Sequence, residues 1–257
     1  MQLLRYNMIS IICIYNNKKI LENYLLNSLK YQNIDYELIL IDNTTGEFKS
    51  AAEALNYGGK KAKGNYLMFI HQDFELESNA LDGLERTLNS LSNLGIAGVA
   101  GKYDYFLISK IKTGVPPIFP GCLPFEEPLK VQTLDECLII IPQTVFHTIK
   151  FDEITCDNWH LYATDYCLSV QEEGFDVYVI PLTGYHVSPG YSFSGKEYYS
   201  TLKKLVKKHN GNYNWIYTTT GSWSTLYPLF LQISYQKLYY FLLKFRLLVK
   251  IKKKLLP

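Results

Sequence analysis

Short apolar runs alternate with segments of helical spacing over the first hundred residues. The runs at 9–15, 36–43, 66–70 and 96–101 are rich in β-branched or aliphatic residues and predict strands, the first of them buried. The segments 18–32, 49–62 and 78–91 between them predict helices, the first with a clear apolar face. Strands and helices that alternate at this distance predict parallel strands joined by right-handed crossovers.

The pattern is less regular in the second half of the chain. Residues 137–141 and 176–180 predict strands, with a helix over 161–175 that ends at Gly174. Residues 102–130 contain seven glycines and prolines and predict a long loop. After about residue 210, aromatic and aliphatic residues alternate with lysines. We therefore expect one domain over residues 1–210 and a C-terminal extension over residues 211–257.

Small polar side chains follow each of the first three predicted strands. In chain order they are Asn16, Asn17, Asp42, Asn43, His71, Gln72 and Asp73. Ligands of open parallel sheets bind beyond the carboxyl ends of the strands. The order of these residues therefore predicts one ligand that lies across this edge. Each residue alone is weaker, because aspartate and asparagine are also common turn formers.

The composition fits a globular protein that buries a core. The chain has 257 residues, of which 47% are hydrophobic and 19% charged, and its formal net charge is +2, which does not favour a nucleic-acid partner. Its five cysteines form no C-x-x-C pair, which favours reduced thiols in a cytoplasmic protein. No signal peptide and no apolar stretch of about 20 residues is visible.

The sequence resembles a known family at the segments ISIICIYNN, ELILIDN and ALNYGGKKAKGNYLMFIHQD. These segments are similar to family 2 glycosyltransferases, and most similar to the StrF-like branch, which has His-Gln-Asp where most members carry Asp-x-Asp. The resemblance covers roughly residues 8 to 190. It implies an α/β protein with a GT-A fold, Rossmann-like, with a mostly parallel central sheet flanked by helices; we expect a helical C-terminal extension in addition.

This resemblance implies an inverting transfer of a sugar from a UDP- or dTDP-linked donor to a hydroxyl, in surface polysaccharide biosynthesis. The nucleotide-sugar-binding residues that it implies are Asn16, Asp42, Asn43, Asn56, Gly58, Lys63, His71, Gln72 and Asp135. Asp42 would accept hydrogen bonds from a uracil or thymine ring, and Lys63 would neutralise phosphate. A turn former at Asp42 and a helix stop at Gly58 are the alternatives.

The same resemblance implies a divalent cation on the diphosphate, Mn²⁺ or Mg²⁺, bound by Asp73 and completed by His186. Because His71 stands where most members have an aspartate, only one carboxylate remains, which favours Mn²⁺. Structural histidines remain the alternative at both positions.

The catalytic base is expected at the helix over 161–175. The family carries two acids one residue apart there, and this chain has Ala163 at the first place and Asp165 at the second. Asp165 is the first candidate and His160 the second. Since five residues turn a helix by about 500°, the two do not share a helix face. His160 must therefore lie on the preceding loop or in the first turn to reach the same pocket.

The C-terminal segment is apolar yet interrupted by Lys237, Lys244 and Arg246 and followed by four further lysines. This pattern favours an amphipathic helix on an anionic membrane surface. The protein would then be peripheral on the inner face of the cell membrane, with a glycan or lipid-linked glycan as acceptor. A helix that packs on the catalytic domain or on a second subunit is the alternative.

Two other functions remain open. A nucleotidyltransferase uses a similar sheet but needs a glycine-rich loop after the first strand, where this chain has Tyr15-Asn16-Asn17-Lys18. A non-catalytic nucleotide-sugar-binding or scaffold protein would account for Ala163 and for the missing first aspartate.

Overall fold

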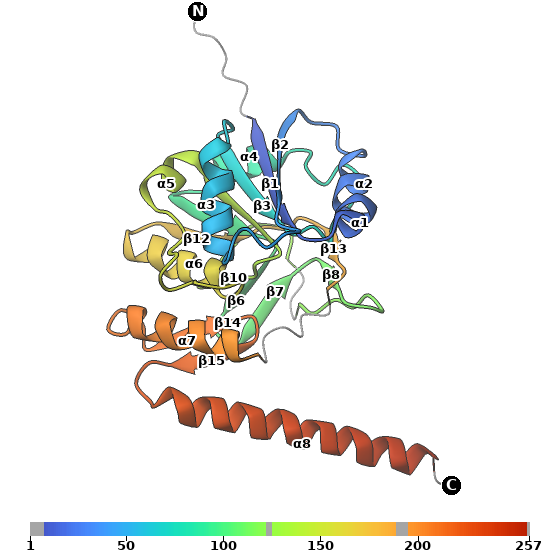
Figure 1. The fold of residues 1–257 in the computed structure, drawn as a ribbon, viewed down its shortest axis with the longest axis vertical. Coiled ribbons are helices and arrows are strands. Elements are labelled where there is room, and N and C mark those ends of the chain that lie inside the picture. Colours follow the sequence, from blue (N-terminus) through green and yellow to red (C-terminus); the bar gives the residue numbers. More distant parts are fainter. Residues whose placement is uncertain (1–7, 122–124, 189–194, 256–257) are drawn as a thin grey trace, which may run out of the picture.

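The computed structural model describes residues 8–121, 125–188 and 195–255, with side chains described up to residue 242. A seven-stranded sheet lies at its centre (Figure 1). In spatial order its strands are β2 (Tyr36–Asp42), β1 (Ile9–Tyr15), β3 (Tyr66–Ile70), β11 (Leu138–Pro142), β5 (Leu94–Gly98), β12 (Asp176–Val179) and β9 (Leu129–Lys130). The first three strands match the sequence prediction.

Strand direction brings two distant segments to one edge of this sheet. β1 pairs in parallel with β2 and β3, and β12 pairs in parallel with β5. β11 lies between β3 and β5 and is antiparallel to both. The amino end of β11 therefore lies beside the carboxyl end of β3, where the His71 amide donates to the Cys137 carbonyl at 3.0 Å.

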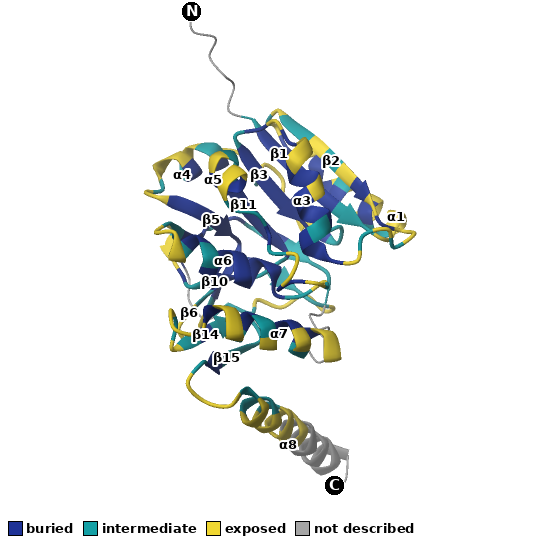
Figure 2. Cartoon of the chain, turned by 60° about the vertical axis from the view of Figure 1, so that its left-hand side comes forward, coloured by how far each residue is buried: buried dark blue, intermediate teal, exposed yellow. Residues whose placement is uncertain are grey.

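Helices cover both faces of the sheet, which confirms the predicted α/β class. On one face lie α1 (Lys18–Leu21), η1 (Glu22–Leu26), α2 (Asn27–Leu29) and α4 (Leu84–Ser90), packed in a cluster that includes Leu25 and Leu88. On the other face lie α3 (Ala51–Lys61), α5 (Gln143–Thr148) and α6 (Tyr162–Glu172), packed in a second cluster. Figure 2 shows the sheet as the most buried layer.

The segment 102–130 is not the long loop that its glycines and prolines predict. Two small sheets use it, one of β10 (Thr133–Leu134), β6 (Ala100–Tyr103) and β7 (Phe106–Ser109), the other of β4 (Phe74–Leu76), β13 (Gly184–His186) and β8 (Lys112–Thr113). Partners such as β13 lie far away in sequence, so local patterns do not reveal these short strands.

Two other predicted elements are shorter or divided. The helix expected from residue 78 begins only at Leu84, because Asn79 (φ 59°) and Gly83 (φ 73°) adopt left-handed conformations that no helix accommodates. The strand expected over 96–101 is divided at Val99 into β5 and β6. Both differences concern element ends and leave the layer order unchanged.

The C-terminal region packs on the outer side of α6. It consists of α7 (Lys196–His209), the hairpin β14 (Trp215–Thr218) and β15 (Gly221–Ser224), and α8 (Leu229–Leu255). Leu161 and Leu168 meet Trp223 in a third hydrophobic cluster, to which α7 and the start of α8 contribute. The expected helical extension is present, and a hairpin precedes it. None of the helices in the described ranges has the length and apolar character needed to cross a membrane.

Cys13, Cys137, Cys156 and Cys167 are buried and form no disulfide, as the expectation of reduced thiols requires. Cys122 lies outside the described residues. Burial raises the pKa of the thiols of Cys13 and Cys167. These thiols therefore pack as small apolar groups.

Candidate functional site

The carboxyl ends of β1 and β3 are joined by a side-chain amide. The oxygen of Gln72 accepts from the backbone amides of Asn16 (3.1 Å) and Asn17 (2.9 Å), and its amide group donates to the Asn16 side-chain oxygen at 2.7 Å. Asn17 caps α1 by accepting from the amide of Ile20. The structure thus fixes this edge of the sheet and leaves the flanking residues His71 and Asp73 to other contacts.

His71, Asp73 and His186 converge at this edge. The Nδ1 atom of His71 lies 3.3 Å from Nε2 of His186, and that Nε2 lies 3.3 Å from Oδ1 of Asp73. The three ligand atoms all lie within 4.8 Å of one another. β13 delivers His186 by pairing with β4 directly after Asp73, and the Val187 amide donates to the Asp73 carbonyl at 3.1 Å.

A tyrosine fixes which nitrogen of His71 faces the cluster. The hydroxyl of Tyr162 donates to the Glu136 carbonyl at 3.3 Å and lies 2.9 Å from Nε2 of His71. This hydroxyl has one proton, and when it donates that proton to the Glu136 carbonyl it accepts from the Nε2–H group of His71. The lone pair of Nδ1 then faces Asp73 and His186, as a metal ligand requires.

Protonation favours the same arrangement. Burial lowers the pKa of His71 to about 4, with a further contribution from His186, against the opposing charges of Asp73 and Asp135. Burial opposes ionisation of Asp73, but the hydrogen bond and charge of His186 and the nearby His71 hold the pKa of Asp73 below its usual value. Near neutral pH the cluster therefore offers a neutral imidazole beside a carboxylate.

These residues fit a divalent cation. Nε2 of His186 lies 3.3 Å from both Nδ1 of His71 and Oδ1 of Asp73, so a proton on this nitrogen would lie between two acceptors. A cation bound by the three side chains would replace this shared proton and satisfy both lone pairs. Two imidazoles and one carboxylate suit Mn²⁺ better than Mg²⁺, which prefers oxygen ligands.

Two cavities meet at the cluster and share His71, Asp73 and Glu136. The smaller, of about 200 Å³, extends along the ends of β1 and β2 beneath Trp159 and Tyr162. The larger, of about 390 Å³, extends toward the C-terminal region, and its lining residues include Asp135, His160, Thr164 and Tyr198. A ligand that occupies both cavities would cross the cluster.

Glu136 is a site residue that the sequence prediction missed. Burial, together with the charge of Asp135, raises the pKa of Glu136 well above its usual value, and the backbone amides of Leu161 and Tyr162 oppose this only in part. Its Oε1 atom is buried and has no hydrogen-bond partner among the described residues. The Glu136 carboxyl therefore stands at the wall between the cavities with its charged form disfavoured and one buried oxygen that has no partner among the described residues. In the sequence, Glu136 could have been found from the Asp135-Glu136 pair at the amino end of an apolar run. This pair lies at the site only if the strand that follows it is antiparallel to β3.

His160 lies on the loop before α6, the position that its predicted role required. Its backbone amide donates to the Asn158 side chain at 3.0 Å, and Leu161 follows in a left-handed conformation (φ 62°). The ring packs edge-on against Tyr198 and lines the larger cavity. Burial lowers the pKa of His160, against the opposing charge of Glu197. At neutral pH this ring is uncharged and able to accept a proton.

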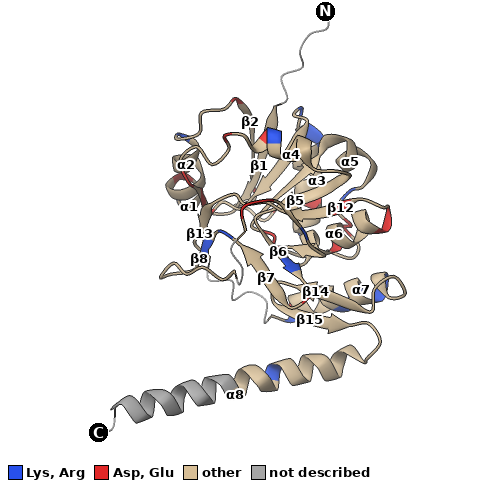
Figure 3. Cartoon of the chain, turned by 180° about the vertical axis from the view of Figure 1, so that it is seen from behind, with Lys and Arg blue, Asp and Glu red and all other residues tan. Residues whose placement is uncertain are grey.

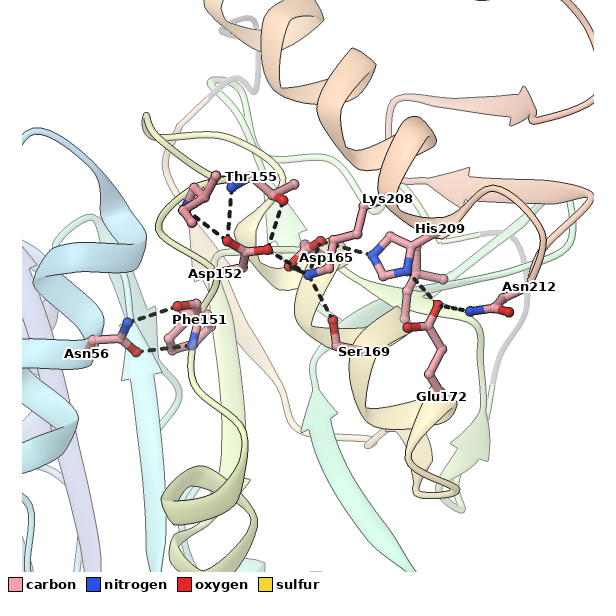
Figure 4. A network of polar contacts seen from close by, with 12 residues as sticks. Asn56, Phe151, Asp152, Thr155, Asp165, Ser169, Glu172, Lys208, His209 and Asn212 are labelled. Carbon is pink, nitrogen blue, oxygen red and sulfur yellow. Dashed lines mark hydrogen bonds and ion pairs between the residues drawn. The ribbon is translucent and has the colours of Figure 1, made fainter.

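Asp165 lines neither cavity, so the structure does not support its predicted role as base. Its side chain is 2% exposed and accepts two hydrogen bonds from Nζ of Lys208, at 3.0 and 2.8 Å (Figure 4). His209 approaches it at 2.9 Å and bridges it to Glu172 at 2.7 Å. Asp165 therefore anchors the end of α7 to α6, and Thr164 is the residue of this turn that lines the larger cavity.

Three predicted nucleotide contacts also lie elsewhere. The amide of Asn56 is buried and binds the backbone of Phe151 through both its nitrogen and its oxygen (Figure 4). A Cβ atom on Gly58 would stand 2.7 Å from Ile12, so this glycine serves the packing of α3 on β1. The amide of Lys63 binds Glu37 at the amino edge of the sheet, a full strand of about 16 Å from His71.

The end of β2 is divided between the surface and the smaller cavity. Asp42 is exposed and accepts from the Thr44 amide (2.8 Å), the Thr44 hydroxyl (2.7 Å) and the Tyr15 hydroxyl (2.9 Å). These bonds lower the pKa of Asp42. Asn43 lines the smaller cavity, although both ends of its amide already bind the backbone of Phe48. Asn16 lines the same cavity.

Comparison with known proteins relates the fold to glycosyltransferases. No family model matches the chain. The protein described as ATP synthase subunits region ORF 6 of Fuscovulum blasticum is 23% identical over 157 residues, which are 58% of this chain and 61% of that protein. Its description states no activity.

Several solved structures share the fold at low sequence identity. They include Staphylococcus aureus TarS (TM-score 0.55, 14% identity, 79% of this chain and 40% of that chain) and GalNAc-T7 with UDP, GalNAc and Mn²⁺ (0.58, 14%, 78% and 47%). A third is the mannosyltransferase PcManGT of Pyrobaculum calidifontis with GDP-Man and Mn²⁺ (0.53, 11%, 78% and 63%). The chain spans less than two thirds of each of these proteins. It has a GT-A fold.

Proposed function

We propose that this protein is a metal-dependent glycosyltransferase. It moves a sugar from a UDP- or dTDP-linked donor to a hydroxyl group, with inversion at the anomeric carbon. The observation that carries this proposal is the cluster of His71, Asp73 and His186 at the junction of two cavities. A cation there would lie between a nucleotide in one cavity and a sugar and its acceptor in the other.

The smaller cavity is proposed to bind the nucleoside. It is open at the carboxyl ends of β1 and β2, and Trp159 and Asn43 offer a ring surface and a polar wall. TarS has been crystallised with UDP-GlcNAc, and GalNAc-T7 with UDP. A nucleotide in the equivalent part of this fold would direct its phosphates toward Asp73.

The cluster would hold Mn²⁺ through Nδ1 of His71, a carboxylate oxygen of Asp73 and Nε2 of His186, with Mg²⁺ as the weaker fit. When bound, the cation offsets the negative charge that gathers on a departing nucleoside diphosphate. Tyr162 would keep His71 in the tautomer that binds metal. GalNAc-T7 and PcManGT were both crystallised with Mn²⁺.

His160 is the proposed base. As the acceptor oxygen attacks the anomeric carbon, the bond from that carbon to the diphosphate oxygen breaks, and the neutral ring of His160 takes the hydroxyl proton. Glu136, which burial keeps protonated, would donate a hydrogen bond to the sugar or the diphosphate. Asp135 would contact a hydroxyl in the larger cavity.

The proposed family branch, pathway and acceptor are supported by the sequence motif alone. His-Gln-Asp at residues 71–73 supports membership of the StrF-like branch and a role in surface polysaccharide biosynthesis, with a glycan as acceptor. A non-catalytic nucleotide-sugar-binding protein would have the same fold, so the two functions need a direct test.

Calorimetry with UDP and with dTDP, each with and without Mn²⁺, tests donor binding. We expect tighter binding with Mn²⁺, and slow release of diphosphate from at least one UDP- or dTDP-sugar in the same buffer. Tight binding without any release, over a panel of donor sugars and acceptors, would support the scaffold function.

Replacing His160 with Gln tests the base. Loss of general base catalysis typically lowers turnover by about 10²- to 10⁴-fold, while the donor should bind as before. His147, which is exposed on α5, offers the matched control His147→Gln with unchanged turnover. Unchanged turnover in His160→Gln would exclude His160 as the base.

A further inference from the structure

The first turns of α8 pack through one face only. Leu229 and Ile233 join the hydrophobic cluster of α7 and the hairpin. Gln232 binds the backbone of Ser224 through its oxygen and its nitrogen, both at 2.8 Å, and Gln236 donates to the Thr220 carbonyl at 3.2 Å. These residues are three or four positions apart, so they share the face of α8 that lies on the protein.

The opposite face of α8 is apolar and exposed. Leu231, Tyr235, Leu238 and Leu242 follow the same helical spacing and are 55%, 71%, 55% and 52% exposed. We call these four residues the outer stripe. Figure 2 shows the described part of α8 as exposed along its outer side. Apolar residues on both faces of a helix indicate that the outer face is also covered in the functional state.

The charge of the chain is strongly divided at the same place. No acidic residue follows Glu197, whereas ten lysines and one arginine do. The last 60 residues therefore contribute +11 to the formal net charge of +2, and the first 197 contribute −9. Figure 3 shows acidic residues on the sheet domain and none on the described part of α8. Whatever covers the outer stripe must tolerate, or attract, this positive charge.

We infer that the outer stripe seats α8 on an anionic lipid bilayer. Apolar side chains of an interfacial helix enter the acyl boundary, while lysines attract anionic headgroups. A second copy of this chain is the less favourable occupant, because it would bring together two α8 segments that each carry seven basic residues and no acidic one.

The position of α8 also indicates the class of acceptor, an inference that rests on the proposed function. Tyr240 of α8 lines the larger cavity, together with Thr219 and Thr220 of the hairpin turn. A bilayer that receives the outer stripe thus lies across α8 from the wall of this cavity, about one helix diameter of 10–12 Å away. The acceptor that reaches His160 from this side is a saccharide carried on a membrane lipid.

Flotation of the full chain with vesicles tests the seating without any turnover. The protein should bind vesicles of phosphatidylcholine that contain about 30% phosphatidylserine, because this anionic lipid makes their surface negative. It should bind vesicles of phosphatidylcholine alone less well. Leu238→Glu should weaken vesicle binding about tenfold or more, because it places a charge where the leucine would enter the acyl boundary of the bilayer. Tyr31→Glu makes the same charge change at another exposed apolar position (58% exposed) and should bind as the unaltered chain does.

Three results would overturn the inference. The first is failure of the unaltered chain to float with anionic vesicles, and the second is equal flotation of Leu238→Glu. The third is a dimer in light scattering that Leu238→Glu dissociates, without binding to vesicles, since a second copy would then cover the stripe.

The orientation is tested with a fluorophore on an introduced cysteine, in a chain in which Cys122 is replaced by serine. A label at Thr219→Cys should be quenched by lipids that carry a nitroxide on the headgroup. A label at Ser90→Cys on α4, near the amino edge of the sheet, should not be quenched. Equal quenching, or quenching at position 90 only, would reject the orientation. Failure of sugar transfer in the presence of normal flotation would reject the proposed function and leave the seating intact.

Discussion

Two clusters of histidines and carboxylates contact α6, one through Tyr162 and the other through Asp165, and they differ in how completely they pair their charges. Around Asp165, each ring nitrogen of the fully buried His209 faces a carboxylate, and Lys208 lies 2.8 to 3.0 Å from Asp165 and Asp152. Around Asp73, Nε2 of His186 lies 3.3 Å from both His71 and Asp73, so one proton at most is shared among the three groups. The two cavities adjoin this cluster.

The difference separates structural clusters from binding clusters. In the Asp165 cluster, positive and negative groups satisfy one another, so a ligand would have nothing to add. The Asp73 cluster has spare lone pairs that face an accessible space, which only a cation or a proton can satisfy. The sequence motif around Asp165 was suggestive, but pairing and access decide which acid acts on a ligand.

Removing the charge of Asp165 should have the largest effect, and on stability. In Asp165→Asn the free energy of unfolding should fall by about 3–5 kcal/mol, because the fully buried His209 and the partly exposed Lys208 lose their shared buried partner. Urea denaturation measures this change. Glu172→Gln, at the more exposed end of the network, should cost less. A fully stable Asp165→Asn protein without turnover would return Asp165 to the reaction.

Removing the charge of Asp73 should act on turnover. In Asp73→Asn, loss of charge stabilisation should lower donor turnover about 10²- to 10³-fold, with little change in the midpoint of thermal unfolding. A steady-state assay with Mn²⁺ measures the rate. Glu75→Gln, two residues away and exposed, is the matched control and should keep full activity. Undiminished turnover in Asp73→Asn would remove the metal from the mechanism.

Tyr162→Phe should have an intermediate effect on the same cluster. Without the hydroxyl that accepts from Nε2, His71 can place its proton on Nδ1, and Mn²⁺ should bind about 10- to 100-fold more weakly. Titration of free Mn²⁺ by electron paramagnetic resonance measures this affinity. Tyr166→Phe, which removes the hydroxyl of a neighbouring tyrosine on α6 that binds the Ile149 carbonyl, should leave the affinity unchanged. Equal affinities of the two variants would contradict the role of Tyr162.

Acid should weaken the Asp165 cluster slightly before the protein unfolds. Burial opposes ionisation of Asp152, but hydrogen bonds from Thr155 and Lys208 hold the pKa of Asp152 below its usual value of 3.8. A carboxylate with a lowered pKa stabilises the fold above its unfolded pKa, and the contribution disappears as pH falls further. Unfolding free energies between pH 5 and pH 3 should therefore fall less steeply in Asp152→Asn, by less than about 1 kcal/mol for this partly exposed group. Identical slopes would argue against the pairing.

The sequence predicted those parts of the molecule that depend on local patterns. The strands before Asn16 and Asp42 and the strand before His71 end where their apolar runs end. Because parallel strands share an edge, Asn16 and the group His71-Gln72-Asp73 could be predicted to lie together, and the resemblance added His186.

The remaining site residues depend on pairing that the sequence does not encode locally. Glu136 reaches the site because β11 is antiparallel, which an apolar run does not reveal. Tyr162 matters through a contact with His71, 91 positions away. Asp165 appeared catalytic because its partners, Lys208 and His209, lie on another helix more than forty residues later.

The separate origins of the proposed cation site and of the cavity wall around Tyr240 have a consequence for how the larger cavity can diversify. The residues that bind the proposed cation stand on β3, β13 and their immediate ends, whereas Leu107, Ile111, Thr219 and Tyr240 on the far wall of the larger cavity come from peripheral segments. The hairpin turn and α8 can vary without touching the proposed cation site, whereas Ile111 directly precedes β8, which pairs with β13 at His186. A single scaffold can in this way be retargeted to new saccharides while its donor chemistry stays constant.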